Sequence, residues 1–212
     1  MKKIDKRKSK YMVLGLMSGT SMDGLDCGLF EICLSRKFDF KWTCIDFKSY
    51  SYKKELVDKI KLVVNKSKKD YKDLDLDLAK FFYDICHLFL DGREIDLVCS
   101  HGQTIIHEDK IRSIQIGDPQ YLYNRLCVPI VHSLRQADIN VGGNGAPLMP
   151  FLDWLLFKDY KTNVVTVNIG GIANISQICI GDFQNEVVGF DTGPGMCLID
   201  RFVNLVWHKN FD

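Results

Sequence analysis

Residues 11–34 read YMVLGLMSGTSMDGLDCGLFEICL, and this stretch decides the fold class. Two apolar runs rich in strand-forming residues flank the polar, glycine-bearing cluster SGTSMDG, so the pattern predicts a β-hairpin with strands at 11–18 and 25–34. A third strand is expected near 40–47. Between residues 29 and 91 there is neither glycine nor proline, and apolar residues recur at helical spacing. This spacing predicts two amphipathic helices after the third strand.

After Gly92 short apolar runs alternate with polar segments, as in an α/β protein. IDLVCS at 95–100 predicts a buried strand leading into a loop, HGQT, and SIQIG at 113–117 predicts another strand, followed by a helix that Asp118 caps. VPIVHS at 128–133 is the next expected strand. Because open α/β sheets bind ligands beyond their strand ends, we expect the polar residues of HGQT to contribute to a site. These residues are His101, Gln103 and Thr104.

The pattern of the amino-terminal segment returns after a Gly/Pro-rich connector, GGNGAPLMP at 142–150, and a predicted helix at 151–157. VVTVNIGGIANISQICI at 164–180 again predicts a strand, a glycine turn and a strand. QNEVVGF at 184–190 predicts a third strand, and a helix is expected from about 195 to 209. We interpret this order as a diverged internal repeat.

The composition excludes several classes of protein. With 46% apolar residues, 26% charged residues and a formal charge of +1, the chain lacks the broad basic surface by which proteins bind nucleic acid. No apolar run approaches the roughly 20 residues that cross a bilayer, so no membrane partner is expected. Residues 1–10 are expected to form a disordered basic tail, since no secretory apolar segment follows them. The cysteines lack metal-ligand spacing, which favours buried thiols in a reducing cytoplasm.

The first motif that could carry chemistry is GLMSGTSMDG at 15–24. A glycine-bearing turn lets backbone N–H groups converge on an anion, and the hydroxyls of Thr20 and Ser21 add donors. Asp23 or Asp26 could hold Mg²⁺ through water, because hard cations prefer oxygen ligands. An ordinary hairpin turn is the alternative interpretation of the motif.

The second motif is VVGFDTGPG at 187–195, where a buried strand ends at Asp191 and a glycine loop opens a helix. This placement suits a carboxylate that orients or deprotonates a nucleophile. An aspartate before Thr-Gly can instead cap the next turn. VNIGGIANIS at 167–176 has no charged group, so it is either a phosphate-facing loop acting through backbone donors or a tight β-turn.

Polar groups of the kind that fix a sugar occur in HGQT and near the connector, at Arg135, Asp138 and Asn144. Taken alone, His101 favours a structural role over a catalytic one. The evidence for a site therefore rests on the motifs in combination.

In this order, GLMSGTSMDGLD, SHGQT, QIGDP, GGNGAPLMP, NIGGIANIS and FDTGPG resemble the anhydro-N-acetylmuramic acid kinase family over residues 12–212. The resemblance implies an α/β protein with the actin-like ATPase, ribonuclease H-like fold, in which two copies of a βββαβαβα unit hold a nucleotide. A near-complete first subdomain with the sugar-binding connector is then expected at 11–158, and an incomplete second subdomain at 159–212. The chain would be the amino-terminal portion of such an enzyme.

The resemblance also implies a function. Members of this family use ATP and Mg²⁺ to open the 1,6-anhydro ring of anhydro-N-acetylmuramic acid with water and to phosphorylate O6, giving N-acetylmuramic acid 6-phosphate in cytoplasmic peptidoglycan recycling. They are typically homodimers. By position, Asp191 matches the general base. The expected ATP-binding residues are Gly19, Thr20, Ser21, Met22, Asp23, Gly24, Leu25, Asp26, Gly170 and Gly171, with Asp23 and Asp26 holding Mg²⁺ through water. The expected substrate-binding residues are His101, Gln103, Thr104, Arg135, Asn144, Gly193 and Gly195.

Three departures from the family pattern affect the predicted site. Ser133 and Leu134 stand where the family has Asp-Phe, Asn144 stands where it has Gln, and Met196 stands where it has Asn. Two alternatives therefore stay open. One is a catalytically incomplete sugar- or nucleotide-binding remnant of the family, and the other is a kinase of the same superfold acting on another sugar.

Overall fold

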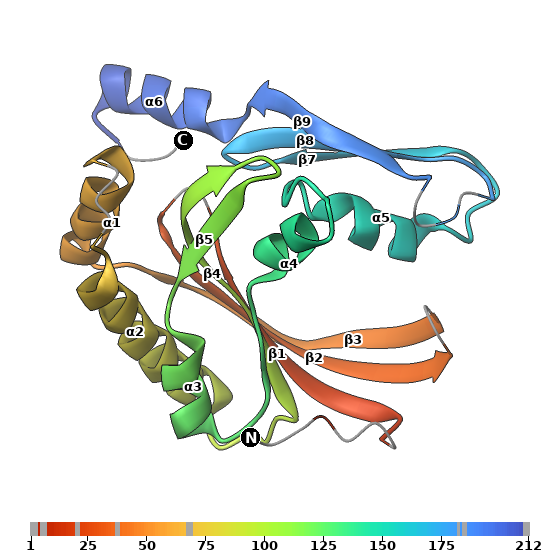
Figure 1. The fold of residues 1–212 in the computed structure, drawn as a ribbon, viewed down its shortest axis with the longest axis horizontal. Coiled ribbons are helices and arrows are strands. Elements are labelled where there is room, and N and C mark those ends of the chain that lie inside the picture. Colours follow the sequence, from red (N-terminus) through yellow and green to blue (C-terminus); the bar gives the residue numbers. More distant parts are fainter. Residues whose placement is uncertain are drawn as a thin grey trace. The chain divides into compact units, whose positions relative to one another are not determined.

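The computed structural model describes residues 4, 8–19, 22–36, 39–66, 70–181, 183 and 186–209. The chain divides into two compact units, residues 1–143 and 144–212 (Figure 1). This division falls earlier than the boundary after residue 158 that the sequence suggests.

The first unit is built on a mixed sheet (Figure 1). Its strands are β1 Lys10–Ser18, β2 Gly24–Arg36, β3 Asp39–Ser51, β4 Leu97–Glu108, β5 Arg112–Ile116 and β6 Ile130–Val131. Their order is β3-β2-β1-β4-β5, and β6 pairs with β4. The β1–β2 and β2–β3 pairs are antiparallel, whereas β4 runs parallel to β1 and β6 and antiparallel to β5. The predicted hairpin and third strand are confirmed.

Strand β4 differs from the expectation that a strand at 95–100 ends in a loop. It continues through HGQT to Glu108, so the polar residues of this motif lie within the sheet. Gly102 permits this course, because its φ is +72° and a side chain there would meet the carbonyl oxygen of Ile116 at 2.9 Å. At the same level the register of β1 against β4 shifts, between Leu16 and Ser18.

The helices of the first unit are α1 Lys54–Lys66, α2 Lys72–Leu90, α3 Pro119–Leu126 and α4 Leu134–Asn140. The first two confirm the predicted amphipathic pair. Leu78 and Phe82 of α2 belong to the same apolar core as Leu14 of β1. At the start of α3 the Asp118 carboxylate accepts a hydrogen bond from the Gln120 amide at 2.8 Å, which confirms the predicted N-cap.

The second unit contains a sheet of order β7-β8-β9 with antiparallel pairs. Its elements are α5 Met149–Phe157, β7 Val164–Ile169, β8 Ile172–Ile178, β9 Val188–Pro194 and α6 Met196–Trp207. The buried Asp153 of α5 accepts hydrogen bonds from the hydroxyls of Thr166 at 2.7 Å and Ser176 at 2.6 Å. These bonds fasten α5 to the second sheet, which explains why this unit begins before the helix.

The described helices include none that combines the length and apolar character required to cross a bilayer. Cys27 and Cys86 are buried thiols as expected, whereas Cys44, Cys127 and Cys197 are exposed.

Candidate functional site

The turn between β1 and β2 contains the first predicted motif. Thr20 and Ser21 lie outside the described residues. The carbonyl oxygen of Gly19 accepts hydrogen bonds from Gln103 Nε2 at 2.9 Å and from the Met22 amide at 3.3 Å. Gly19 is therefore held from strand β4 as well as from within the turn.

The other end of the turn is held from the residue after β3. The Tyr52 amide donates to the Asp23 carbonyl oxygen at 2.9 Å. Gly24 lies so close to the backbone of Tyr50 that any side chain would collide with it. Leu25 faces the core and is 1% exposed, so only its backbone could reach a nucleotide.

Asp23 and Asp26 are the predicted Mg²⁺ carboxylates. Asp23 is exposed, while Oδ1 of Asp26 accepts a hydrogen bond from Ser49 Oγ at 2.5 Å. The described part of the chain contains no group of three or more His, Cys, Asp or Glu side chains that could hold a metal ion. Mg²⁺ is usually held by one or two carboxylates together with water and substrate phosphates, so these oxygen donors fit it.

His101 of β4 and Arg135 of α4, both predicted substrate residues, contact each other. Arg135 Nε donates to His101 Nε2 at 3.0 Å, so the ring proton resides on Nδ1, which donates to the Gly102 carbonyl oxygen at 2.7 Å. Burial and the positive charge of Arg135 lower the pKa of His101 from its ordinary value of 6.5. His101 is thus a neutral acceptor that orients the guanidinium, and this arrangement suits a supporting role better than a general acid.

The other predicted substrate residues of the first unit, Gln103 and Thr104, form hydrogen bonds within the protein. Gln103 is fully buried, and its amide bonds Ser18, Gly19 and the backbone of Thr104. An amide engaged in this way has little capacity left for a sugar. The Thr104 hydroxyl accepts a hydrogen bond from Gln115 Nε2 at 3.4 Å.

Asp191, the predicted general base, lies exposed on β9. It pairs in register with Asn174 of β8, which pairs in turn with Asn168 of β7. Cross-strand partners share a face of the sheet, so these three polar residues form one row. The register of β8 against β9 shifts beside this row, where the Thr192 hydroxyl donates to the Ala173 carbonyl oxygen at 3.1 Å.

The predicted glycines of the second unit meet at one end of this sheet. The Gly195 amide donates to the Gly171 carbonyl oxygen at 2.9 Å, and the Met196 amide donates to that of Gly170 at 2.8 Å. A side chain at Gly195 would collide with the Gly170 carbonyl oxygen, so this approach requires glycine. The turn of the second hairpin and the start of α6 are thereby joined. Gly193, near the end of β9, has a φ of +136°.

Asn144 is exposed at the beginning of the second unit. Beside it, Gly143 of the first unit lies so close to the Asp138 carboxylate that a side chain would collide with it. Of the departures from the family pattern, Met196 begins α6. Ser133 has a left-handed backbone before α4, and its hydroxyl lies 2.8 Å from His132 Nδ1.

Sequence reasoning missed three residues of this arrangement. Asn168 and Asn174 lie three residues on either side of Gly171, and they pair because Ile169 pairs with Ala173, which leaves a connection of three residues. A two-residue turn at Gly170-Gly171 would pair Asn168 with Ala173 instead. The length of this connection, which the local sequence does not set, therefore decides the pairing. Tyr52 has no local motif, because pairing of β2 with β3 is what brings it to the first turn.

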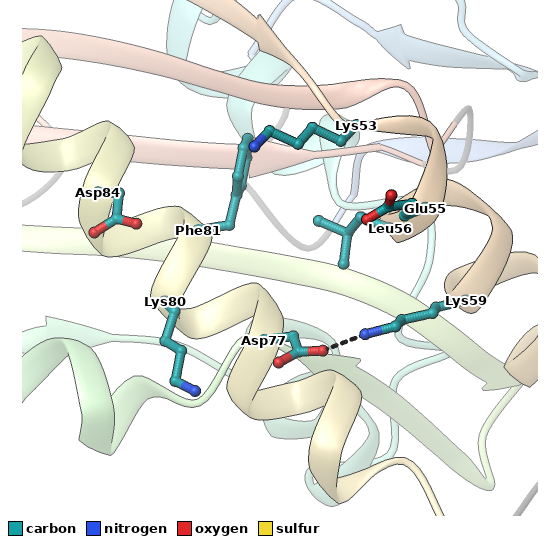
Figure 2. Close-up of a pocket in the computed structure, with 8 residues that line it drawn as sticks. All are labelled: Lys53, Glu55, Leu56, Lys59, Asp77, Lys80, Phe81 and Asp84. Carbon is teal, nitrogen blue, oxygen red and sulfur yellow. Dashed lines mark hydrogen bonds and ion pairs between the residues drawn. The ribbon is translucent and has the colours of Figure 1, made fainter.

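A surface hollow of about 270 Å³ lies between α1 and α2 (Figure 2). An ion pair between Lys59 and Asp77, 2.7 Å long, spans the two helices there. The hollow is lined by Lys53, Glu55, Leu56, Lys59, Asp77, Lys80, Phe81 and Asp84. None of the predicted site residues is among them, so the hollow is separate from the candidate site.

Comparison with known proteins agrees with the motif series. The sequence model of the anhydro-N-acetylmuramic acid kinase family matches residues 11–212. The anhydro-N-acetylmuramic acid kinase of Caldanaerobacter subterraneus subsp. tengcongensis is 34% identical, over 97% of this chain and 56% of its own length. That of Pelagibacter ubique is 35% identical, over 95% of this chain and 56% of its own length. The chain thus spans about half the length of the curated relatives it matches.

Among solved structures, a ROK family protein from Streptococcus pneumoniae, in complex with sucrose, is similar with a TM-score of 0.32 and 13% identity. The likeness covers 81% of this chain and 47% of that one, and is too weak to carry an argument. The sequence match is independent of it and extends across both structural units. By that match, the chain belongs to the anhydro-N-acetylmuramic acid kinase family.

Proposed function

We propose that the protein containing this chain is an ATP-dependent kinase that opens 1,6-anhydro-N-acetylmuramic acid with water and phosphorylates O6, giving N-acetylmuramic acid 6-phosphate. The observation that carries the proposal is the family match over residues 11–212, which includes Asp191 and both glycine turns. The exposed carboxylate of Asp191, in a row with Asn174 and Asn168, supports it. Action in the cytoplasm as a homodimer belongs to the same proposal.

The strand arrangement supports an actin-like, ribonuclease H-like fold as part of this proposal. In the first unit an antiparallel meander, β3-β2-β1, continues into β4 and β6, which run parallel to β1 and to each other. The second unit repeats the meander as β7-β8-β9. In such a fold each unit presents its first hairpin turn to the phosphates. Here these turns would be the ones at 19–23 and 170–171.

In the proposed reaction Asp191 accepts a proton from water as the water oxygen bonds to C1 of the sugar. The bond from C1 to O6 breaks, and the freed O6 bonds the γ-phosphorus of ATP while the bond to the ADP oxygen breaks. Mg²⁺, when bound, would neutralise charge on the phosphates, and Asp23 and Asp26 would hold it through water. Asp191 lies on the same face as Asn174, whose amide would help to orient the attacking water.

The remaining predicted residues divide between the two ligands. The backbone of the 19–24 turn and of Gly170-Gly171 would face the phosphates. Arg135, oriented by His101, would bind polar groups of the sugar, because a guanidinium offers donors in a fixed planar fork. Asn144, Gly193 and Gly195 belong to the same substrate proposal, as does Thr104.

The proposal is tested by incubating the purified protein with ATP, Mg²⁺ and anhydro-N-acetylmuramic acid in ¹⁸O-labelled water. We expect ADP to form together with a sugar phosphate that carries one label at C1, because the C1 oxygen comes from water. N-acetylglucosamine serves as the competing acceptor. Formation of ADP without a labelled sugar phosphate, or equal use of both sugars, would contradict the proposal.

A further inference from the structure

A directed chain of hydrogen bonds runs from Tyr52 to the first turn. The Tyr52 hydroxyl lies 2.6 Å from Ser18 Oγ, and Ser18 Oγ donates to Gln103 Oε1 at 2.5 Å. A serine hydroxyl has a single proton, so Ser18 must accept from Tyr52. With Oε1 turned to Ser18, the Gln103 amide directs Nε2 at the Gly19 carbonyl oxygen, 2.9 Å away. Each bond therefore fixes the direction of the next.

The chain is shielded from water. Ser18 and Gln103 are 0% exposed and Tyr52 is 7% exposed. Burial raises the pKa of Tyr52 far above its ordinary value, which keeps the hydroxyl protonated as a donor. The ring is fixed by Phe81, which packs against it edge-on at a centroid distance of 5.2 Å. In such surroundings a satisfied network is rigid and an unpaired member is costly.

Tyr52 holds the turn at both ends. Its side chain acts through Ser18 and Gln103 on the carbonyl of Gly19, and its own amide donates to the carbonyl of Asp23 at 2.9 Å. A carbonyl oxygen is the negative end of a peptide dipole and repels phosphate. Held toward the protein, these two oxygens cannot turn toward an anion at the turn.

We propose that Tyr52 and Gln103 are positioning residues that hold the carbonyl oxygens of Gly19 and Asp23 away from the nucleotide phosphates and so preorganise these two ends of the turn. The inference rests on the proposed function, since the ligand is the phosphate group of ATP. It assigns Gln103 to the nucleotide turn rather than to the sugar. Preorganised donors cost no rearrangement when the anion binds, which is why such a network favours affinity.

The test uses Tyr52→Phe, which removes only the hydroxyl, and Gln103→Met, which keeps the length of the side chain but loses its polar atoms. Tyr83→Phe is the matched control, because Tyr83 packs against the same core while its ring contacts Tyr121 and Arg125. In the ligand-free protein, hydrogen exchange of the Met22 and Tyr52 amides should become about two- to tenfold faster in both test variants, as expected for a lost hydrogen bond. Tyr83→Phe should leave these rates unchanged.

The second measurement is calorimetric titration with MgATP and, separately, with the anhydro-sugar. Both test variants should weaken MgATP binding about two- to tenfold and leave sugar binding unchanged, a split that general destabilisation would not produce. Unchanged exchange in both variants would overturn the inference. So would faster exchange with unchanged MgATP affinity, or equal weakening of both ligands. Failure of the wild-type protein to bind MgATP would overturn the proposed function and the nucleotide role together, while the exchange rates alone decide whether the turn is held.

Discussion

The opening strands of the two units have similar apolar sequences but bury them differently. In β1, Leu14 and Leu16 are 0% and 2% exposed, because the side that they face is covered by the core of the first unit. In β7, Val165 and Val167 are 60% and 63% exposed. Apolar runs rich in strand-forming residues predicted both strands, yet they did not predict which face another element covers.

The covered face of the second sheet carries several polar side chains beside the buried Ile178. Helix α5 packs on β8 and β9, and its buried Asp153 binds the hydroxyls of Thr166 and Ser176. Asn174 and Asp191 pair in register on this same face. The first unit thus covers its opening strand mainly with apolar side chains, with the buried pair of Ser18 and Gln103 as an exception, whereas the second places hydrogen-bonding groups beneath a helix, next to the proposed catalytic carboxylate.

Removing the charge of Asp191 tests its proposed role as the general base. Asp191→Asn should lower kcat by ~10²–10⁴-fold, because the amide cannot accept the proton of the attacking water. The unfolding temperature should not change, since the side chain is exposed. Asp159→Asn, an exposed aspartate of the same unit, is the control. Near wild-type turnover by Asp191→Asn, measured as ADP release with the anhydro-sugar, would remove the proposed base.

The polar network of the second unit can be tested separately from catalysis. Asp153→Ala should destabilise this unit by on the order of 3 kcal/mol, because two hydrogen bonds to a charged group are lost in a buried place. Hydrogen exchange should show weaker protection in β7 and β8, with β1 and β4 unaffected. Equal loss of protection in both units would show that they unfold together, and no loss would show that α5 is held by its apolar contacts alone.

Much of the fold followed from local patterns, and parts of the site did not. Local patterns predicted the hairpins, the pair α1 and α2, and the Asp118 cap. These patterns are apolar runs around glycine turns, the helical spacing of apolar residues and N-capping chemistry, which act over a few residues. The course of β4 through HGQT did not, because it depends on Gly102 lying against β5. The role of Tyr52 was not predicted either, because its contact with Ser18 is long-range and forms only when β1, β2 and β3 pair. The pairing of Asn168 with Asn174 did not follow either, because it depends on a three-residue connection where the two glycines suggest a two-residue turn.

A matched pair of substitutions measures the difference between the two sheets directly. Val98 of β4 is 0% exposed and Val167 of β7 is 63% exposed, and both are valines within strands. Val98→Thr should cost about 1–3 kcal/mol, because it buries a hydroxyl without a prepared partner. Val167→Thr should change the free energy of unfolding by less than about 0.5 kcal/mol. Urea denaturation of both variants gives the comparison, and similar costs would mean that the face bearing Val167 is covered in solution.

The pair of His101 and Arg135 in the first unit should make stability depend on pH. The folded protein holds the pKa of His101 below the value of about 6.5 that an unfolded chain has, through burial and the charge of Arg135. The unfolded state therefore binds a proton that the folded state does not, as pH falls below about 6.5. By linkage, the contribution of His101 to stability is complete above this pH and declines as pH falls toward the folded pKa.

His101→Gln should abolish this part of the pH dependence in urea denaturation between pH 5 and 7. Arg135→Gln should reduce it without abolishing it, because one of the two causes, burial, remains. If the difference in stability between wild type and His101→Gln stayed constant across this range, the neutral, acceptor state of His101 deduced from its contact with Arg135 would be wrong.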